Sequence, residues 1–482
     1  MLVQPTKIFA RSLHTQKISL HRSYLIYPII ASYQKGGKSV RLFGKYRMTT
    51  FQIIAFGFIA LILLGTLLLS LPFASRKAGS VGFLDCLFTA TSAVCVTGLV
   101  VQDTAACWSP FGQAVILTLI QIGGMGVVTA AVSLAFLSGR KIGLMQRSVM
   151  QESISAPQVG GIVRLTRFIV LSSLGMEAVG ALLLIPSMIP HFGVGKGIWY
   201  AVFHSVSAFC NAGFDLMGAQ EPFSSLTGFS QNGLVNVTVM MLITVGGIGF
   251  LVWNDVREHG FHWKQYRLQS KAALFTSAWL VILPALWLFF FEMEQIPAGK
   301  RILPALFQSV TLRTAGFNTV DLNHISRSGQ ALMIVCMLVG GSPGSTAGGM
   351  KTTTLAVLLT TAFAVFRRKE QVTFGGRRIA DDTVRQAIAI LMMYLLLFFG
   401  SGLIISRIEG LPLMSCLFET ASAIGTVGLT LGITSHVSVA SRLILIVLMF
   451  LGRVGGLTLI YAAQSVKKGT QSTLPLEKIT VG

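Results

Sequence analysis

Two short segments far apart in the chain have nearly the same sequence. Residues 86–99 read Cys-Leu-Phe-Thr-Ala-Thr-Ser-Ala-Val-Cys-Val-Thr-Gly-Leu, and residues 416–429 read Cys-Leu-Phe-Glu-Thr-Ala-Ser-Ala-Ile-Gly-Thr-Val-Gly-Leu. Residues 203–214 and 307–317 share their outline: a Phe, then nine or ten positions later a Gly that precedes an apolar residue. Internal similarity of this kind predicts four copies of one structural unit.

Each short segment lies between two long apolar runs. The long runs are 51–73, 111–137, 165–190, 232–253, 272–291, 330–366, 386–406 and 440–464. Each is long enough for a helix that crosses a hydrocarbon core of about 30 Å, whereas the intervening segments are too short and suit buried or re-entrant helices. We therefore predict an all-α polytopic membrane protein in which four pseudo-symmetric M1–pore helix–M2 repeats, with eight transmembrane helices, surround a central pore.

The composition supports this class and sets the orientation. Of the 482 residues, 53% are hydrophobic and 11% are charged, with a net charge of +21, whereas soluble domains carry about 25% charged residues. In the eight-span arrangement, +20 of this net charge falls on one side. Because positive loops stay in the cytoplasm, we expect a plasma (inner) membrane protein with both termini cytoplasmic, and we exclude a nucleic-acid partner.

The repeats also divide the chain. We expect a basic N-terminal extension, the four repeats and a cytoplasmic tail at 1–50, 51–137, 138–254, 255–366, 367–465 and 466–482. The extension contains nine Lys and Arg and no acidic residue. It resembles an organellar transit peptide, it also suits a disordered arm on anionic membrane lipid, and Met48 is a third possibility, as the natural start. We favour the last two interpretations.

A glycine ends each short segment: Gly98, Gly213, Gly316 and Gly428. Non-helical backbone at membrane depth survives only where protein buries it or where it lines a water-filled path. Glycine tolerates the dihedral angles that such a path needs, and a ring of carbonyls can replace the hydration shell of a cation. The alternative is close helix packing, which better suits the second glycine motif, found in the second long run of each repeat: Gly123, Gly124 and Gly126, and Gly246, Gly247 and Gly249.

The third repeat departs from the pattern between residues 340 and 351. This stretch contains five glycines and one proline, which disfavour a helix interior. We predict a broken helix with a mobile gate loop below the filter; a kinked packing helix is the alternative. The gate residues are Gly340, Gly341, Ser342, Pro343, Gly344, Ser345, Thr346, Ala347, Gly348, Gly349 and Lys351.

Arg453 is the second departure, since it replaces the second glycine of the repeated pair. A charge within a membrane helix is costly and indicates a functional site. We expect Arg453 to face the pore below the filter, where it either repels a cation or holds the loop through backbone carbonyls. The alternatives are snorkelling or a structural salt bridge, for which Glu177 is a conceivable partner.

These motifs resemble the Trk/Ktr/HKT potassium-uptake superfamily, and most closely its Ktr membrane subunit. The resemblance implies potassium as substrate and an intramembrane loop that obstructs the pore. It also implies sodium dependence, a homodimer and a ring of cytosolic regulatory subunits that carry the nucleotide-binding domains, with no cofactor in this chain. The filter residues that it implies are Val96, Thr97, Gly98, Asn211, Ala212, Gly213, Thr314, Ala315, Gly316, Thr426, Val427 and Gly428.

Other polar residues give weaker signals. Asp215 and Asp321 follow filters two and three and either attract cations or are solvated loop carboxylates. We interpret Arg313 and Glu419 as packing or bracing residues in preference to ion ligands. Two alternative functions remain open, an intramembrane enzyme and a subunit of an ion-pumping ATPase. The sequence has no Walker A run, and no histidine within a long apolar run can serve as a catalytic base, so we expect no enzyme activity.

Overall fold

The computed structural model describes residues 40–42, 46–77, 79, 81–137, 142–154, 156, 158–219 and 221–455. The described chain is mostly helical. Its strands form two short antiparallel hairpins, β1 (Val40–Leu42) with β2 (Tyr46–Met48) and β3 (Thr373–Phe374) with β4 (Arg377–Arg378). Most of the predicted extension and all of the predicted tail lie outside the described residues.

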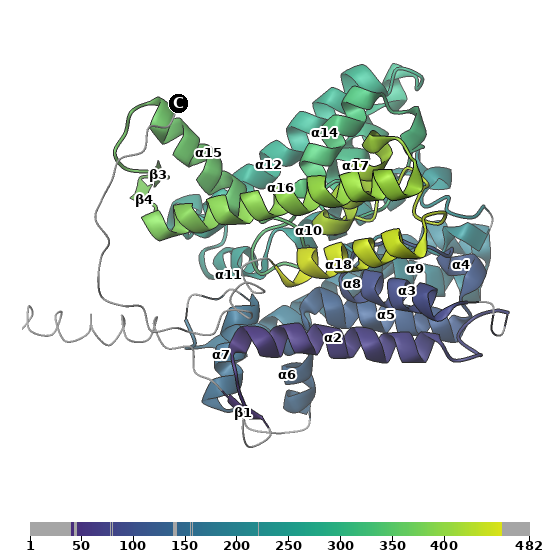
Figure 1. Ribbon diagram of the computed structural model, residues 1–482, viewed down its shortest axis with the longest axis horizontal. Helices are drawn as coiled ribbons and strands as arrows, with labels where there is room; N and C mark the ends of the chain where they lie inside the picture. Colours follow the sequence, from purple (N-terminus) through teal and green to yellow (C-terminus); the bar gives the residue numbers. More distant parts are fainter. Residues whose placement is uncertain are drawn as a thin grey trace, which may run out of the picture.

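Four continuous helices have the length and hydropathy of membrane spans. They are α2 (Thr50–Leu69), α8 (Ile162–Phe192), α12 (Leu268–Trp287, continued by a π-helical turn to Glu292) and α16 (Asp381–Glu409). Each corresponds to the first long helix predicted for one repeat. In Figure 1, α2 and α16 run roughly parallel, with α18 (Val439–Val454) between them and in contact with both.

The second long run of repeats one and two is bent. In repeat one, α5 (Pro110–Met125) meets α6 (Val127–Leu137) at 100°, and in repeat two α10 (Gly233–Gly247) meets α11 (Phe250–His259) at 92°. The glycines at the two bends have φ angles of 87° and 97°, which a residue with a Cβ adopts only with strain. The expectation of one long helix in each of these runs was therefore wrong, because the third glycine of the motif turns the chain.

The two remaining runs contain shorter helices. In repeat three, α14 (Arg327–Leu338) and α15 (Thr352–Phe366) are separated by the glycine-rich stretch, so the helix is broken where the sequence predicted a break. In repeat four, α18 is followed by residues outside the described part of the chain. The structure thus contains four apolar spans, or six if each bent pair is one span, and the eight-helix arrangement remains a prediction.

A short helix packs beside the first long helix of each repeat. These helices are α3 (Phe83–Val94), α9 (Val194–Phe209), α13 (Ile302–Thr311) and α17 (Leu413–Gly425). They contact α2, α8, α12 and α16 respectively. Their C-terminal halves are buried on nearly every face, with only Val202 and Val206 of α9 partly exposed.

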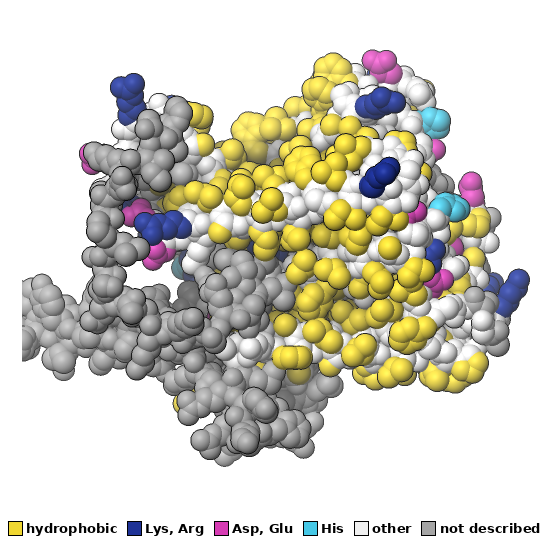
Figure 2. Space-filling model, viewed as in Figure 1, with side chains coloured by type: hydrophobic (Ala, Val, Ile, Leu, Met, Phe, Trp, Pro, Cys, Tyr) yellow, Lys and Arg dark blue, Asp and Glu magenta, His cyan; other side chains and the backbone are white. Residues whose placement is uncertain are grey.

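The remaining helices lie in the connections. They are α4 (Thr104–Cys107) and α7 (Leu144–Ile154), with short 3-10 turns at Met217–Ala219, Thr227–Phe229, Trp263–Gln265, Ala298–Lys300 and Leu322–His324. The visible surface carries a broad hydrophobic band across the long helices, whereas charged side chains gather toward their two ends (Figure 2). Such a band is typical of a surface that faces lipid.

The glycine pairs of the second helices allow close backbone contact. A Cβ on Gly123, Gly246 or Gly452 would collide with a carbonyl oxygen at the end of the neighbouring short helix, that of Val94, Phe209 or Ile424 respectively. This contact fits the packing role expected for the pairs, because only a residue without a side chain lets the two backbones approach this closely.

We predict that Gly123→Ala destabilises the protein by about 1–3 kcal/mol, because the added methyl group overpacks a backbone contact. The matched control is Gly175→Ala on the outer face of α8, where an added Cβ meets no atom within 4 Å. Thermal unfolding of both purified variants measures the difference. Equal melting temperatures for the two would contradict the packing role of Gly123.

Candidate functional site

The four short helices end in the same unusual backbone conformation. Two positions before each segment's glycine, a residue with a side chain has a positive φ: Val96 (51°), Asn211 (56°), Thr314 (62°) and Thr426 (53°). The glycines themselves also have positive φ: Gly98 (91°), Gly213 (69°), Gly316 (82°) and Gly428 (94°). Positive φ at a non-glycine residue costs about 1–3 kcal/mol and concentrates at functional sites, so four copies at one repeat position indicate a shared role.

The four segments lie next to one another in a closed ring. A Cβ on Gly98 would approach the Ala212 carbonyl oxygen to 2.5 Å, and one on Gly213 would approach the Ala315 carbonyl oxygen to 2.7 Å. The same contact joins the third segment to the fourth, through Gly316 and the Val427 oxygen, and the fourth back to the first, through Gly428 and the Thr97 oxygen. All twelve predicted filter residues are buried. The ring thus surrounds one axis and is lined by backbone.

Hydroxyl side chains hold each segment in place. Gly98 N–H donates to Ser92 Oγ at 3.1 Å, and Gly428 N–H donates to Ser422 Oγ at 3.0 Å. In the other two repeats the hydroxyl donates instead, Ser207 to the Phe214 carbonyl at 2.7 Å and Thr311 to the Phe317 carbonyl at 2.6 Å. The sequence analysis missed these four residues, although their common position, five or six residues before the glycine, is visible once the repeats are aligned.

Three threonines of the segments have hydroxyl groups without a hydrogen-bond partner among the described residues: Thr97, Thr314 and Thr426. All three are fully buried. A buried hydroxyl without a partner costs roughly 1–3 kcal/mol. These groups are therefore available to a ligand at the ring.

The glycine-rich stretch of repeat three forms a loop beneath the ring. Thr346 Oγ1 donates to Asn211 Oδ1 at 2.8 Å. A Cβ on Gly348 would collide with Thr426, and one on Gly340 would lie 3.0 Å from the Thr314 methyl group. The loop therefore contacts the segments of repeats two, three and four, in each case at the residue two positions before the glycine.

Glycines of the second helices in repeats two and four anchor this loop. Ser342 N–H donates to the Gly247 carbonyl at 2.9 Å, and Gly349 N–H donates to the Gly452 carbonyl at 3.2 Å. In return, Phe250 N–H at the bend of repeat two donates to the Gly344 carbonyl at 2.6 Å. The loop is thus hydrogen-bonded to the second helices of repeats two and four.

Arg453 connects the loop to the first repeat. Its guanidinium donates to the Thr346 carbonyl of the loop and, at 2.9 Å, to the Gly124 carbonyl at the end of α5. Glu177 instead accepts two bonds from the Gln121 amide at 2.9 and 3.0 Å, and no salt bridge joins it to Arg453 within the described residues. Backbone carbonyls, rather than Glu177, are therefore the recorded partners of Arg453.

Below the loop lies a cavity of about 280 Å³. It is bordered by both positively charged residues of the predicted gate, Arg453 and Lys351, together with Glu152 and the glycines at the end of α5. Lys351 Nζ donates to the Ala347 carbonyl at 2.8 Å, so its side chain folds back onto the loop. The loop and Arg453 therefore lie between the ring and this inner cavity.

The weaker polar candidates have local partners. Glu419 accepts hydrogen bonds from Thr430 and, at 2.9 Å, from Thr434, both in the loop after filter four. Asp215 accepts from the Met217 N–H at 2.9 Å. Arg313 is buried, and its Nε and one Nη have no hydrogen-bond partner in the described chain. The contacts of Glu419 support the bracing interpretation, because they connect the pore helix to its following loop.

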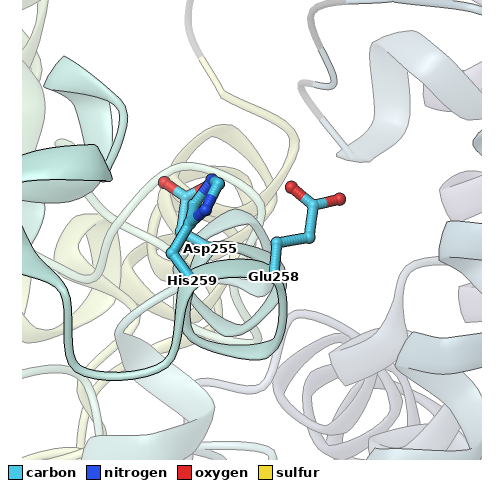
Figure 3. Close-up of side chains that lie close together, drawn as sticks. All are labelled: Asp255, Glu258 and His259. Atoms are coloured by element: carbon cyan, nitrogen blue, oxygen red, sulfur yellow. The ribbon is translucent and has the colours of Figure 1, made fainter.

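A cluster of acidic and histidine side chains on α11 contains Asp255, Glu258 and His259 (Figure 3). Asp255 accepts from Arg267 N–H at 3.1 Å and from Ser270 Oγ at 2.6 Å, which caps the N-terminus of α12. The Arg267 guanidinium also lies 3.3 Å from Asp255 and 3.7 Å from Glu258. Arg267 and Ser270 therefore contact the two carboxylates, and Asp255 connects α11 to the start of α12.

Comparison with known proteins identifies relatives of this chain. Residues 26–471 match the family model TrkH, described as a cation transport protein. The chain is 39% identical to the potassium/sodium uptake protein NtpJ of Enterococcus hirae, over 86% of this chain and 93% of that protein. It is 36% identical to the Ktr system potassium uptake protein B of Bacillus subtilis, with the same coverage.

The fold has a counterpart among solved structures. The potassium transporter TrkH from Vibrio parahaemolyticus matches with a TM-score of 0.68 at 21% identity, over 86% of this chain and 84% of that chain. This likeness shows the fold alone. The matched relatives are cation transporters rather than enzymes, which excludes the intramembrane-enzyme alternative. Together with the family model, which spans most of the sequence, they show that the chain belongs to the TrkH family of cation transport proteins.

Proposed function

We propose that this chain takes up potassium through the ring of four glycine segments. The observation that carries the proposal is the closed order of contacts from Gly98 through Gly213 and Gly316 to Gly428 and back. Relatives named for potassium or potassium/sodium uptake support potassium as the substrate. The whole arrangement consists of eight membrane helices in four repeats, of which the broken and bent second helices line the inner half of the pore.

The filter works by replacing water with backbone oxygen. Carbonyls of the twelve filter residues coordinate the dehydrated ion, and the hydroxyls of Thr97, Thr314 and Thr426 add oxygen ligands at the ring. The C-terminus of each short helix contributes a partial charge of about −0.5. Four such ends aimed at one axis favour a cation. The bonds to Ser92 and Ser422 keep the ring from collapsing when no ion is bound.

The gate consists of the loop at 340–351 and Arg453. The loop lies against the inner ends of three filter segments, and Arg453 ties it to the end of α5. With the loop in this position, an ion that leaves the filter meets backbone and a guanidinium charge. Opening therefore requires that the bond from Arg453 to Thr346 breaks and that the loop withdraws toward the inner cavity.

We place the protein in the plasma (inner) membrane, with the filter open to the outside and both termini in the cytoplasm. The positive charge of the linkers supports this orientation. The same basic face suits a ring of cytosolic regulatory subunits that bind nucleotide and act on a homodimer of this chain. Relatives named as components of a Ktr system support such partners, and a relative named for potassium/sodium uptake supports sodium dependence.

The first prediction from this proposed function concerns selectivity. We expect Gly316→Ser to lower potassium uptake and to reduce potassium-over-sodium selectivity by about tenfold, because a side chain at this φ distorts the carbonyl ring. Uptake in a potassium-uptake-deficient strain, with and without sodium, measures both effects. Gly299→Ser is the control, since an added Cβ there meets no atom within 4 Å. Identical selectivity in the two variants would refute the filter assignment.

The second prediction concerns the gate. Arg453→Gln removes a charge and the hydrogen bonds that connect the loop to α5. We therefore expect this variant to raise potassium flux several-fold, and we expect a shortened loop to have the same effect. The control is Arg407→Gln near the outer end of α16, with the same loss of charge. Unchanged uptake kinetics in both gate variants would rule the gate out.

A third measurement separates this function from an ATPase subunit. Vesicles that contain only the purified chain, with no ATP present, should show potassium flux down its gradient. We expect Arg453→Gln vesicles to conduct even without regulatory subunits. If flux appears only when an added partner hydrolyses ATP, the result contradicts the proposed uptake through the ring and supports the ATPase subunit instead.

A further inference from the structure

A second cavity, of about 1020 Å³, opens on the outside of the helix bundle. It lies where α6 and α7 meet the first turns of α8. Its walls are mainly apolar and include Val163, Val170, Leu171 and Leu174 of α8. The cavity is separate from the ring, the loop and the inner cavity, so the proposed conduction path does not account for it.

Three arginines border the cavity: Arg147 from α7, and Arg164 and Arg167 from α8. No acidic residue lies among the described lining residues. Within the described chain, none of the three guanidinium groups has a recorded ion pair or side-chain hydrogen bond. Three uncompensated positive charges at one site attract an anion, and a guanidinium fork matches the geometry of a phosphate.

The order of residues along α8 separates charge from apolar surface. Arg164, Arg167, Leu171 and Leu174 recur every three or four positions, so they share one face of the helix. With a rise of 1.5 Å per residue, Leu174 lies about 15 Å from Arg164 along the axis. Leu171 and Leu174 are 59% and 48% exposed. The face therefore begins with cations and continues as an apolar stripe.

The length of α8 allows the boundary between these two parts to lie at the membrane surface. The helix has 31 residues, about 46 Å at 1.5 Å per residue, and exceeds a hydrocarbon core of about 30 Å. Because the two arginines stand in its first two turns, we place that end of α8 in the headgroup region and Leu171 and Leu174 among acyl chains. A soluble anion would use only the cations and leave the apolar stripe uncovered.

We propose that this groove binds one anionic phospholipid of the leaflet that we assign to the cytoplasm. Its phosphate lies between Arg147, Arg164 and Arg167, and an acyl chain packs along Leu171 and Leu174. Basic pockets between membrane helices on this side recognise anionic headgroups in general. The bound lipid joins α7 and α8, which belong to the linker and the first helix of repeat two.

Native mass spectrometry of the purified full chain tests this proposal. Phosphatidylglycerol and phosphatidylcholine with the same acyl chains are added separately, and the bound fraction is titrated. We expect the wild-type chain to prefer phosphatidylglycerol, and Arg164→Gln/Arg167→Gln to bind it about 10- to 30-fold more weakly, because two phosphate contacts are lost. Excess inorganic phosphate should leave the bound lipid in place.

The matched control is Arg368→Gln/Arg377→Gln, which removes two exposed arginines outside this groove on the same side. It should bind phosphatidylglycerol like the wild type. Arg147→Gln, on a different helix, should give a partial loss and serves as the second variant if the double substitution fails to fold. Equal binding of both lipids by the wild type, equal loss in the control, or displacement by inorganic phosphate would overturn the proposal.

Discussion

Four glycines approach four carbonyl groups so closely that the surrounding helices must pack to accommodate these contacts. At each contact a side chain would collide with the neighbouring segment. The short helices must therefore end at the ring of glycine segments. Because they end there, their C-terminal halves are buried. The hydroxyls of Ser92, Ser207, Thr311 and Ser422 then complete the backbone hydrogen bonds that no helix or sheet supplies.

A second set of close contacts forms around the first. The glycine pairs of the second helices press against the ends of the short helices, and the next glycine turns the chain away. This turn makes room beneath the ring, and in repeat three the room is filled by a loop. The loop is hydrogen-bonded to repeats two and four, and Arg453 adds a bond between it and repeat one. The loop and the ring are therefore in direct contact, as the proposed filter and gate require.

Much of this arrangement was predictable from the repeats. The short helices, the position of the glycine after each one and the break in repeat three were all expected from residue spacing, because periodicity and glycine content act locally. The bends at Gly126 and Gly249 were missed, since their flanking sequences are apolar and form good helices. The hydroxyl braces were also missed. Their partners lie only six or seven residues further along the chain, but the bonds form only because the segment leaves the helical conformation.

The amino-acid sequence alone pointed to the class of protein, to four similar segments and to the glycine that ends each one. It did so because hydrophobic run length and glycine position depend on local chemistry. The partners of individual side chains and carbonyl groups emerged from the folded structure. It separated Glu177 from Arg453, bonded Arg453 to Thr346 and Gly124, and closed the four segments into one ring. These contacts join residues about 100 to 330 positions apart, where packing of whole helices, rather than local preference, sets which groups meet.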